Sequence, residues 1–146
     1  MLGFSFNGMP KFQSPDEELA FLRTQVANRE KELQRIGHFE QAGTNAAHEI
    51  ISTYKKMPIE AVVHKDAILK DKEKDAIVLA LRPEAHDQVM EELLGIVITK
   101  GIKNAFSVVE KMGNPHVDDD FHRLLIQYFK TGELSSIIKE GTPLYK

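Results

Sequence analysis

The sequence predicts a mainly α-helical domain with at most one or two short strands and an N-terminal coiled-coil-like helix. Three observations predict this class. Apolar residues recur at spacings of three and four along most of the chain, and residues typical of helix starts and stops bracket these segments. Only AIVLAL and the stretch 103–110 are also compatible with a short strand. The 146 residues are 42% hydrophobic and 28% charged, which is typical of a globular chain.

Composition divides the chain into five segments. Gly3, Gly8 and Pro10 interrupt any pattern near the N-terminus, so we expect a flexible arm there. The expected order is the arm at 1–13, a helical or coiled-coil segment at 14–63, a charged linker at 64–75, a compact helical domain at 76–132 and a tail at 133–146.

The first predicted helix begins after Ser14 and ends before Gly37. Ser14 can cap it, Pro15 suits the first helical position, and Glu17 completes an S-x-x-E capping box. Its apolar positions form a heptad seam, in which Arg29 occupies one core position. The seam residues are Leu19, Leu22, Val26, Leu33 and Ile36. A narrow apolar stripe on a polar helix favours pairing with another chain, by self-association or with a protein partner.

A second, shorter helix is expected over AAHEIISTYKKM, capped by Thr44 or Asn45 and interrupted by Pro58. IEAVVH then fits one more turn. The stretch HKDAILKDKEKD, residues 64–75, alternates lysines with acids and shows no apolar period. This pattern is typical of a solvated linker, so we expect the least ordered internal segment and the main boundary of the chain there.

Beyond the linker the apolar pattern becomes denser. AIVLAL, residues 76–81, is consistent with a buried strand. Pro83 then opens a helix that runs to about Lys100 and is stopped by Gly101. IKNAFSVVEKM has helical spacing, but the sequence leaves open whether 103–110 is helix or strand.

The stretch GNPHVDDDFHRLL contains the residues that most resemble a metal site. Asp118 and His122 are four positions apart and would share a helix face, and His116 could complete a site from the preceding turn. A helix start explains more of the pattern, because Asp118 stands at an N-cap position and acids fill the first turn of a helix over about 119–131. We therefore predict a helix start here, with no metal, cofactor or catalytic residue.

A second candidate is the adjacent pair His86 and Asp87. HD-type metal-dependent phosphohydrolases use such a pair, completed by a separate His and a separate Asp, to hold metal ions. Here His48 or His64 could supply the first, and the acids at 118–120 the last. The pair falls in the first turn of a helix without an apolar shell to enclose a metal, so this activity is the alternative function.

Composition argues against several other functions. A net charge of −3 does not attract a polyanion, so no nucleic-acid partner is expected. The absence of cysteine excludes disulfides and thiolate sites and fits a reducing cytoplasm. AIVLAL is the longest apolar run, too short for a transmembrane segment, and neither a phosphate-binding loop nor a nucleophile elbow is present. Together, these observations favour a non-enzymatic interaction or scaffolding module that is cytoplasmic or membrane-proximal.

The segment LRPEAHDQVMEELLGIVITKGIKNAFSVVEKMGNPHVDDDFHRLLIQYFKTG resembles a block in large uncharacterised proteins of candidate-phylum bacteria. The stretch SPDEELAFLRTQVANREKELQ resembles the acidic, coiled lead-in of those proteins. The resemblance covers most of residues 14–132. It implies the N-terminal region of a longer bacterial protein in an assembly linked to secretion. No activity is established for that family, so the resemblance gives no residue a role.

Overall fold

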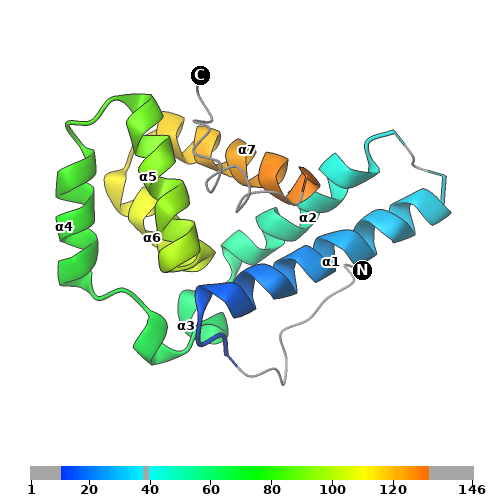
Figure 1. The fold of residues 1–146 in the computed structure, drawn as a ribbon, viewed down its shortest axis with the longest axis horizontal. Coiled ribbons are helices and arrows are strands. Elements are labelled where there is room, and N and C mark those ends of the chain that lie inside the picture. The colour runs from blue at the N-terminus through cyan, green and yellow to red at the C-terminus, as the bar shows by residue number, and fades with distance from the viewer. Residues whose placement is uncertain (1–10, 38–39, 132–146) are drawn as a thin grey trace.

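The computed structural model describes residues 11–37 and 40–131, and in this part of the chain it shows seven α-helices and one short 3₁₀ turn (Figure 1). The helices are α1 (Pro15–Arg35), α2 (Ala42–Lys56), α3 (Ile59–Val62), α4 (Asp71–Leu81), α5 (His86–Thr99), α6 (Ile102–Met112) and α7 (Pro115–Thr131), and the 3₁₀ turn is Lys65–Ala67. The described residues form no strand beyond a single parallel bridge between Phe12 and Val63. The mainly α prediction is therefore confirmed.

Helix α1 starts as the sequence predicts. The Ser14 hydroxyl accepts a hydrogen bond from the Glu17 amide at 3.2 Å, and the Glu17 carboxylate accepts one from the Gln13 amide at 2.8 Å. The helix ends before Gly37, whose φ of 96° is one that other residues rarely adopt.

The heptad seam of α1 is buried within the chain itself. Four of its five members lie in the core, and Ile36 at the end of the helix is 54% exposed: the buried members are Leu19, Leu22, Val26 and Leu33. Helix α1 packs along α2 and also contacts α5, α6 and α7. Arg29 forms an ion pair with Glu49 of α2, with 3.2 Å between Nε and Oε2. The interpretation of this seam as a surface for another chain was therefore wrong, because helices from the same chain cover it.

The predicted linker is folded. Leu69 is buried, its amide donates to the Asn104 side-chain oxygen at 2.9 Å, and α4 already begins at Asp71. AIVLAL belongs to α4, so the strand expected there is a helix, and 103–110 lies inside α6 and is helical too. Residues on both sides of 64–75 share one hydrophobic core, which extends from Phe12 to Phe129. The boundary does not separate two independently packed units.

The ends of the chain lie mostly beyond the described residues. Of the predicted arm, 1–10 fall outside them, and so does the tail at 133–146. Phe12, by contrast, is buried, and its amide donates to the Val62 carbonyl oxygen at 2.8 Å. The last residues of the expected flexible arm are therefore packed on the fold.

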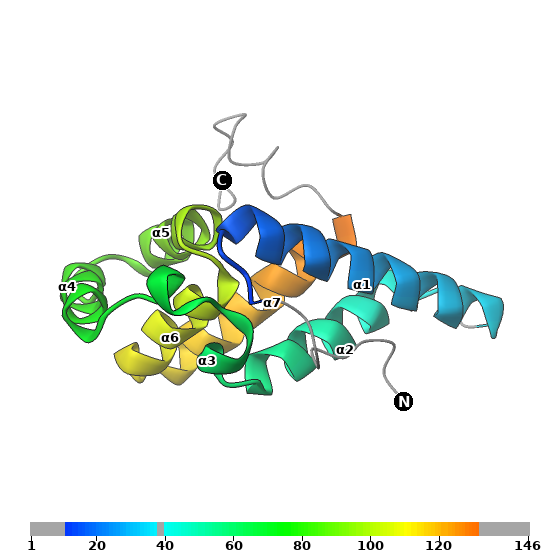
Figure 2. The same cartoon turned by 90° about the horizontal axis from the view of Figure 1, so that it is seen from below.

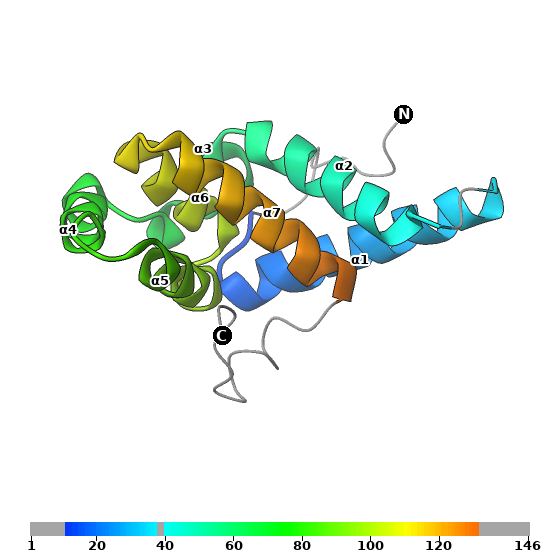
Figure 3. The same ribbon diagram turned by 90° about the horizontal axis from the view of Figure 1, so that it is seen from above.

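Three helices mark the opposite ends of the molecule. Helices α1 and α2 lie side by side and extend to one end, whereas α4 stands at the other end, where it packs mainly against α6 (Figures 1 and 2). Helix α7 lies between α2 and α5 (Figure 3). Within the described ranges, none of the helices combines the length and apolar character that a membrane span requires.

Candidate functional site

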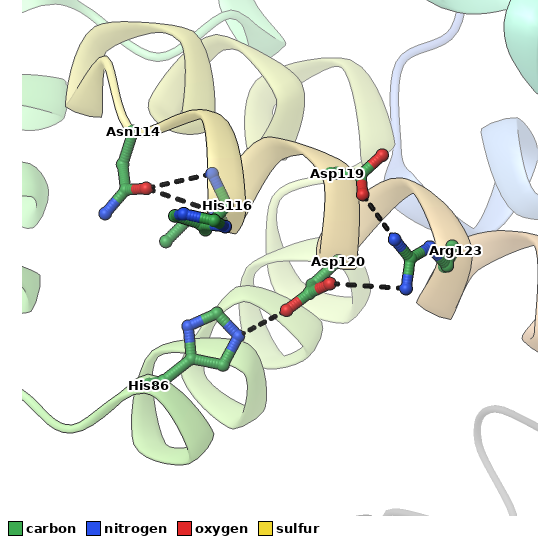
Figure 4. A network of polar contacts seen from close by, with 7 residues as sticks. His86, Asn114, His116, Asp119, Asp120 and Arg123 are labelled. Atoms are coloured by element: carbon green, nitrogen blue, oxygen red, sulfur yellow. Dashed lines mark hydrogen bonds and ion pairs between the residues drawn. The ribbon is translucent and has the colours of Figure 1, made fainter.

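Helix α7 starts one turn earlier than predicted. The Asn114 side-chain oxygen accepts hydrogen bonds from the amides of His116 and Val117 at 3.0 and 3.4 Å, and Pro115 takes the first helical position (Figure 4). Asp118 is therefore not the N-cap, and that prediction was wrong. An Asn-Pro pair can begin a helix as well as an acid can, and here it does so before the aspartates.

The side of α7 that faces α2 holds Asp118 and His122. The Asp118 carboxylate forms an ion pair with Lys55 of α2, with 2.7 Å between Oδ1 and Nζ. His122 Nε2 lies 3.4 Å from the Ser52 hydroxyl, and its ring meets the His48 ring edge-on, with 5.7 Å between centroids. Desolvation lowers the pKa of His122, and the nearby charges of Lys55 and His48 lower it further.

The contact between Ser52 and His122 does not form a hydrolytic triad. His122 Nδ1 is buried and has no hydrogen-bond partner in the part of the chain that the structure describes. In a serine hydrolase that nitrogen is held by a carboxylate, which fixes the tautomer of the base. Ser52 also lies within α2 and not on a sharp turn that would expose its hydroxyl.

The opposite side of α7 holds Asp120, which meets the predicted candidate His86. His86 Nε2 and Asp120 Oδ2 are 2.7 Å apart, and Arg123 lies 3.7 Å from Asp120 and 2.5 Å from Asp119 (Figure 4). His86, Asp120 and Arg123 border an open cleft of about 480 Å³ that Asp87 also lines. The pair His86 and Asp120 joins the starts of α5 and α7.

The predicted metal candidates do not converge. His86 and Asp87 lie in the cleft beside Asp120, whereas His116, Asp118 and His122 line a separate cleft on the other side of α7. Across residues 11–37 and 40–131, no group of three or more His, Cys, Asp or Glu side chains is placed to hold a metal ion. A phosphohydrolase of the HD type needs several His and Asp side chains that converge on its metal ions. Here only His86 and Asp120 are in contact.

A third cleft, of about 350 Å³, contains the amine of Lys103. This ammonium donates to the Lys55 carbonyl oxygen at 2.9 Å and to that of Met57, and it lies 5.1 Å from the centre of the Tyr54 ring. Burial lowers the pKa of Lys103 to about 8, against the opposing effect of Glu18. Because its bonds go to carbonyls at the end of α2, Lys103 serves to close that helix.

Glu18 binds the free amides at the start of α6, as Lys103 binds the free carbonyls at the end of α2. Its buried carboxylate accepts hydrogen bonds from the amides of Ile102 and Lys103 at 2.5 and 3.1 Å and from the Tyr54 hydroxyl. Desolvation raises the pKa of Glu18, and these hydrogen bonds oppose the rise. Glu18, Tyr54 and Lys103 thus tie α1, α2 and α6 together. Because the polar groups of these three residues bind one another or the backbone, their burial needs no ligand to explain it.

The feature that the other contacts leave unexplained is the outer face of α4, which consists of Ala76, Leu79 and Ala80. Val78 and Leu81 point into the core, while Leu79 is 74% exposed, and the alanines beside it are exposed as well. The only other large apolar side chain that is exposed in the described residues is Ile36. AIVLAL therefore buries only part of its apolar surface, and the rest faces outward.

Sequence reasoning could find some of this site and missed the rest. A 3.6-residue period does separate Val78 and Leu81 from Ala76, Leu79 and Ala80, and acids around Asp71 resemble a helix start. These signals identify the helix but do not say which of its faces is covered. Nothing in the sequence distinguishes the buried Glu18 from the exposed acids beside it.

Comparisons with protein-family models, curated proteins and solved structures gave no significant match. The resemblance to the large proteins of candidate-phylum bacteria therefore stays an expectation, and functional inference depends on the geometry.

Proposed function

We propose that this chain is a non-enzymatic protein-interaction module and that the outer face of α4 is its contact surface. The observation that carries the proposal is the exposure of Leu79 at the centre of an apolar helix face. Burying a leucine side chain is worth roughly 1.5–3 kcal/mol. Covering the exposed Leu79 with a partner would therefore favour binding. Apolar faces with a polar rim are typical of protein–protein contact sites.

The surroundings of this face support the same function. Helix α4 stands at one edge of the molecule, so a partner could reach it without displacing another helix (Figure 1). Charged side chains stand near both ends of α4, and those of Lys72, Arg82 and Glu84 form no ion pair within the described ranges. An apolar centre with a polar rim is the usual composition of an interface.

The cellular setting is part of the proposal and is supported only by the resemblance. In this view the module serves a bacterial cytoplasmic or membrane-proximal assembly linked to secretion, and α4 attaches it there.

A photo-crosslinking amino acid at position 79 tests the proposal. We expect it to give a discrete protein adduct in intact cells, because the side chain would lie inside the contact. The same amino acid at Lys31, an exposed position of α1, is the matched control and should give none. Absence of an adduct from position 79, or equal adducts from both positions, would refute the proposal.

The HD-type phosphohydrolase is the second candidate, favoured by the contact between His86 and Asp120 beside a cleft. Its test is metal analysis of the purified chain together with a panel of phosphatase substrates. Stoichiometric metal, and phosphate release that His86→Ala abolishes, would replace the interaction proposal.

A further inference from the structure

We propose that the amine of Lys103 is a covalent acceptor for short acyl groups carried by thioesters. The site is the cleft bordered by residues of α2, α3, α6 and α7, so the inference is independent of the α4 face and of the proposed function. Three observations carry it: the place of the lysine at an apolar cleft, the two carbonyls that hold its amine, and the burial of that amine.

The cleft gives a small reagent access to a lysine that is otherwise buried. Lys103 is only 4% exposed, yet it lines the cleft of about 350 Å³ beside the end of α2. Apolar side chains form much of the remaining wall, and these are Met57, Pro58, Ile59 and Phe106. A short acyl chain can lie against such a wall, whereas the low exposure of the lysine disfavours a bulky donor.

The two carbonyls hold the amine in an orientation that suits attack. Lys103 Nζ donates to the Lys55 carbonyl oxygen at 2.9 Å and to that of Met57. An ammonium has three N–H donors and no lone pair, whereas an uncharged amine has two donors and one lone pair. Both donors can stay on the two carbonyls, so the lone pair of the uncharged amine points away from them. The bonds that close α2 therefore leave the nucleophilic electron pair free.

The burial of the amine makes its uncharged form common near neutral pH. Burial lowers the pKa of Lys103 to about 8, and the charge of Lys55 acts in the same direction. The groups that oppose this fall are Glu18, Glu110, Glu60 and the Tyr54 ring, whose centre lies 5.1 Å from Nζ. At pH 8 about half of the Lys103 amine is uncharged, against less than about 1% for an ordinary exposed lysine. Desolvation beside another cation is one way in which proteins activate a lysine nucleophile.

The reaction needs no reactant beyond the thioester. The lone pair of the amine attacks the carbonyl carbon of the thioester, a C–N bond forms and the C–S bond breaks. The leaving thiolate takes up, through solvent, the proton that the nitrogen loses, so the products are an amide and a thiol. The amide keeps one N–H, which can still donate to one of the two carbonyls at the end of α2.

Acetylation of the full chain by S-acetyl-N-acetylcysteamine, mapped by mass spectrometry, tests the inference. At pH 8 Lys103 should react at least about tenfold faster than Lys56, because far more of its amine is uncharged. Lys56 is the matched control, since it lines the same cleft but is exposed. Unfolding the chain in urea should remove the difference. A Lys103 that reacts no faster than Lys56, or a difference that persists in urea, would overturn the inference.

A substitution confirms which amine reacts. Lys103→Arg retains donors for the two carbonyls but removes the nucleophile, so the fast phase of acetylation should disappear while circular dichroism shows the same helices. A fast phase that survives in the folded variant would overturn the inference. The map of the wild-type chain decides the question even where this variant does not fold.

The pH profile and the length of the acyl chain give two further readouts. The rate at Lys103 should rise with pH and level off above about pH 8, where its amine has lost its proton. The butanoyl thioester, relative to the acetyl thioester, should favour Lys103 over Lys56, because the longer chain covers more of the apolar wall. A Lys103 rate that still climbs at pH 10, or an equal butanoyl-to-acetyl ratio at both lysines, would contradict the site.

Discussion

Single polar side chains set the starts of two helices, one from nearby in the sequence and one from far away. Asn114 caps α7 from the preceding residue, whereas Glu18 receives the first amides of α6 across 84 positions of sequence. Each cap satisfies backbone donors that a helix start leaves without intrahelical partners. The carboxylate of Asp118, which the sequence suggested for the first role, is instead paired with Lys55 and is 48% exposed.

The cap of α7 gives a direct prediction. Asn114→Ala should lower the free energy of unfolding by about 1 kcal/mol, as lost caps do, and Asn114→Ser should be nearly neutral. Asp118→Ala should cost less than about 1 kcal/mol, because it removes only a half-exposed ion pair. Urea unfolding measures all three. A larger loss for Asp118→Ala than for Asn114→Ala would return the capping role to Asp118.

The start of α6 depends on a glycine as well as on Glu18. Gly101 has a φ of 104°, and a Cβ there would lie 2.6 Å from a carboxylate oxygen of Glu18. We expect Gly101→Ala to destabilise the fold by more than about 2 kcal/mol, from backbone strain and displacement of the buried carboxylate.

Gly95, inside α5, is the matched control. A Cβ there meets nothing within 4 Å, so Gly95→Ala should stabilise the protein by about 0.4–1 kcal/mol. Relative to the wild type, the melting temperature should therefore fall for Gly101→Ala and rise for Gly95→Ala. Equal melting temperatures for them would contradict the role of Gly101.

At the scale of whole helices, each element is amphipathic, and the neighbouring helices decide which apolar side chains are covered. The seam of α1 has the spacing of a coiled coil, yet α2 of the same chain occupies it. Helix α4 meets α6 on one side only, so Leu81 is buried and Leu79 is exposed. The contact of α2 with α7 includes the half-buried His122, so we expect this contact to depend on pH.

The lowered pKa of His122 sets the sign of that sensitivity. Because the folded chain binds the proton less tightly than the unfolded one, the free energy of unfolding should fall as pH drops below about 6.5 and level off below the folded pKa. The groups that act on this proton are Lys55, His48, Asp118 and Asp119. His122→Gln should remove this part of the pH dependence, as measured by urea unfolding at a series of pH values.

His116→Gln provides the comparison, because His116 lies on the same helix and is exposed. It should leave the pH profile of the wild type unchanged. A His122→Gln profile that overlays the wild type would show that this proton does not contribute.

At the scale of the whole molecule, one core unites segments that the composition separates. The stretch at 64–75 looks like a linker, but Asn104 of α6 fixes it by accepting from the Leu69 amide and donating to the Ala67 carbonyl oxygen at 2.8 Å. Leu69 itself enters the core. The charged residues of this stretch cover the surface of a folded segment.

We expect Asn104→Ala to release this segment. The loss of buried hydrogen bonds should cost about 1–3 kcal/mol and should speed hydrogen exchange at the Leu69 amide. The exposed Asn45→Ala should do neither. Rapid exchange at Leu69 already in the wild type would support the flexible linker that the sequence suggested.

The sequence alone determined the secondary structure of most of this protein. Spacings of three and four, the Ser14 and Glu17 pair and the stops at Gly37 and Gly101 act within a turn or two, so they can be recognised locally. Only the tertiary structure decided what each face contacts. Whether the α1 seam meets its own chain, whether Glu18 caps a distant helix and whether Leu79 stays exposed all depend on groups brought together from remote positions, because a hydrophobic face requires burial but does not specify its partner.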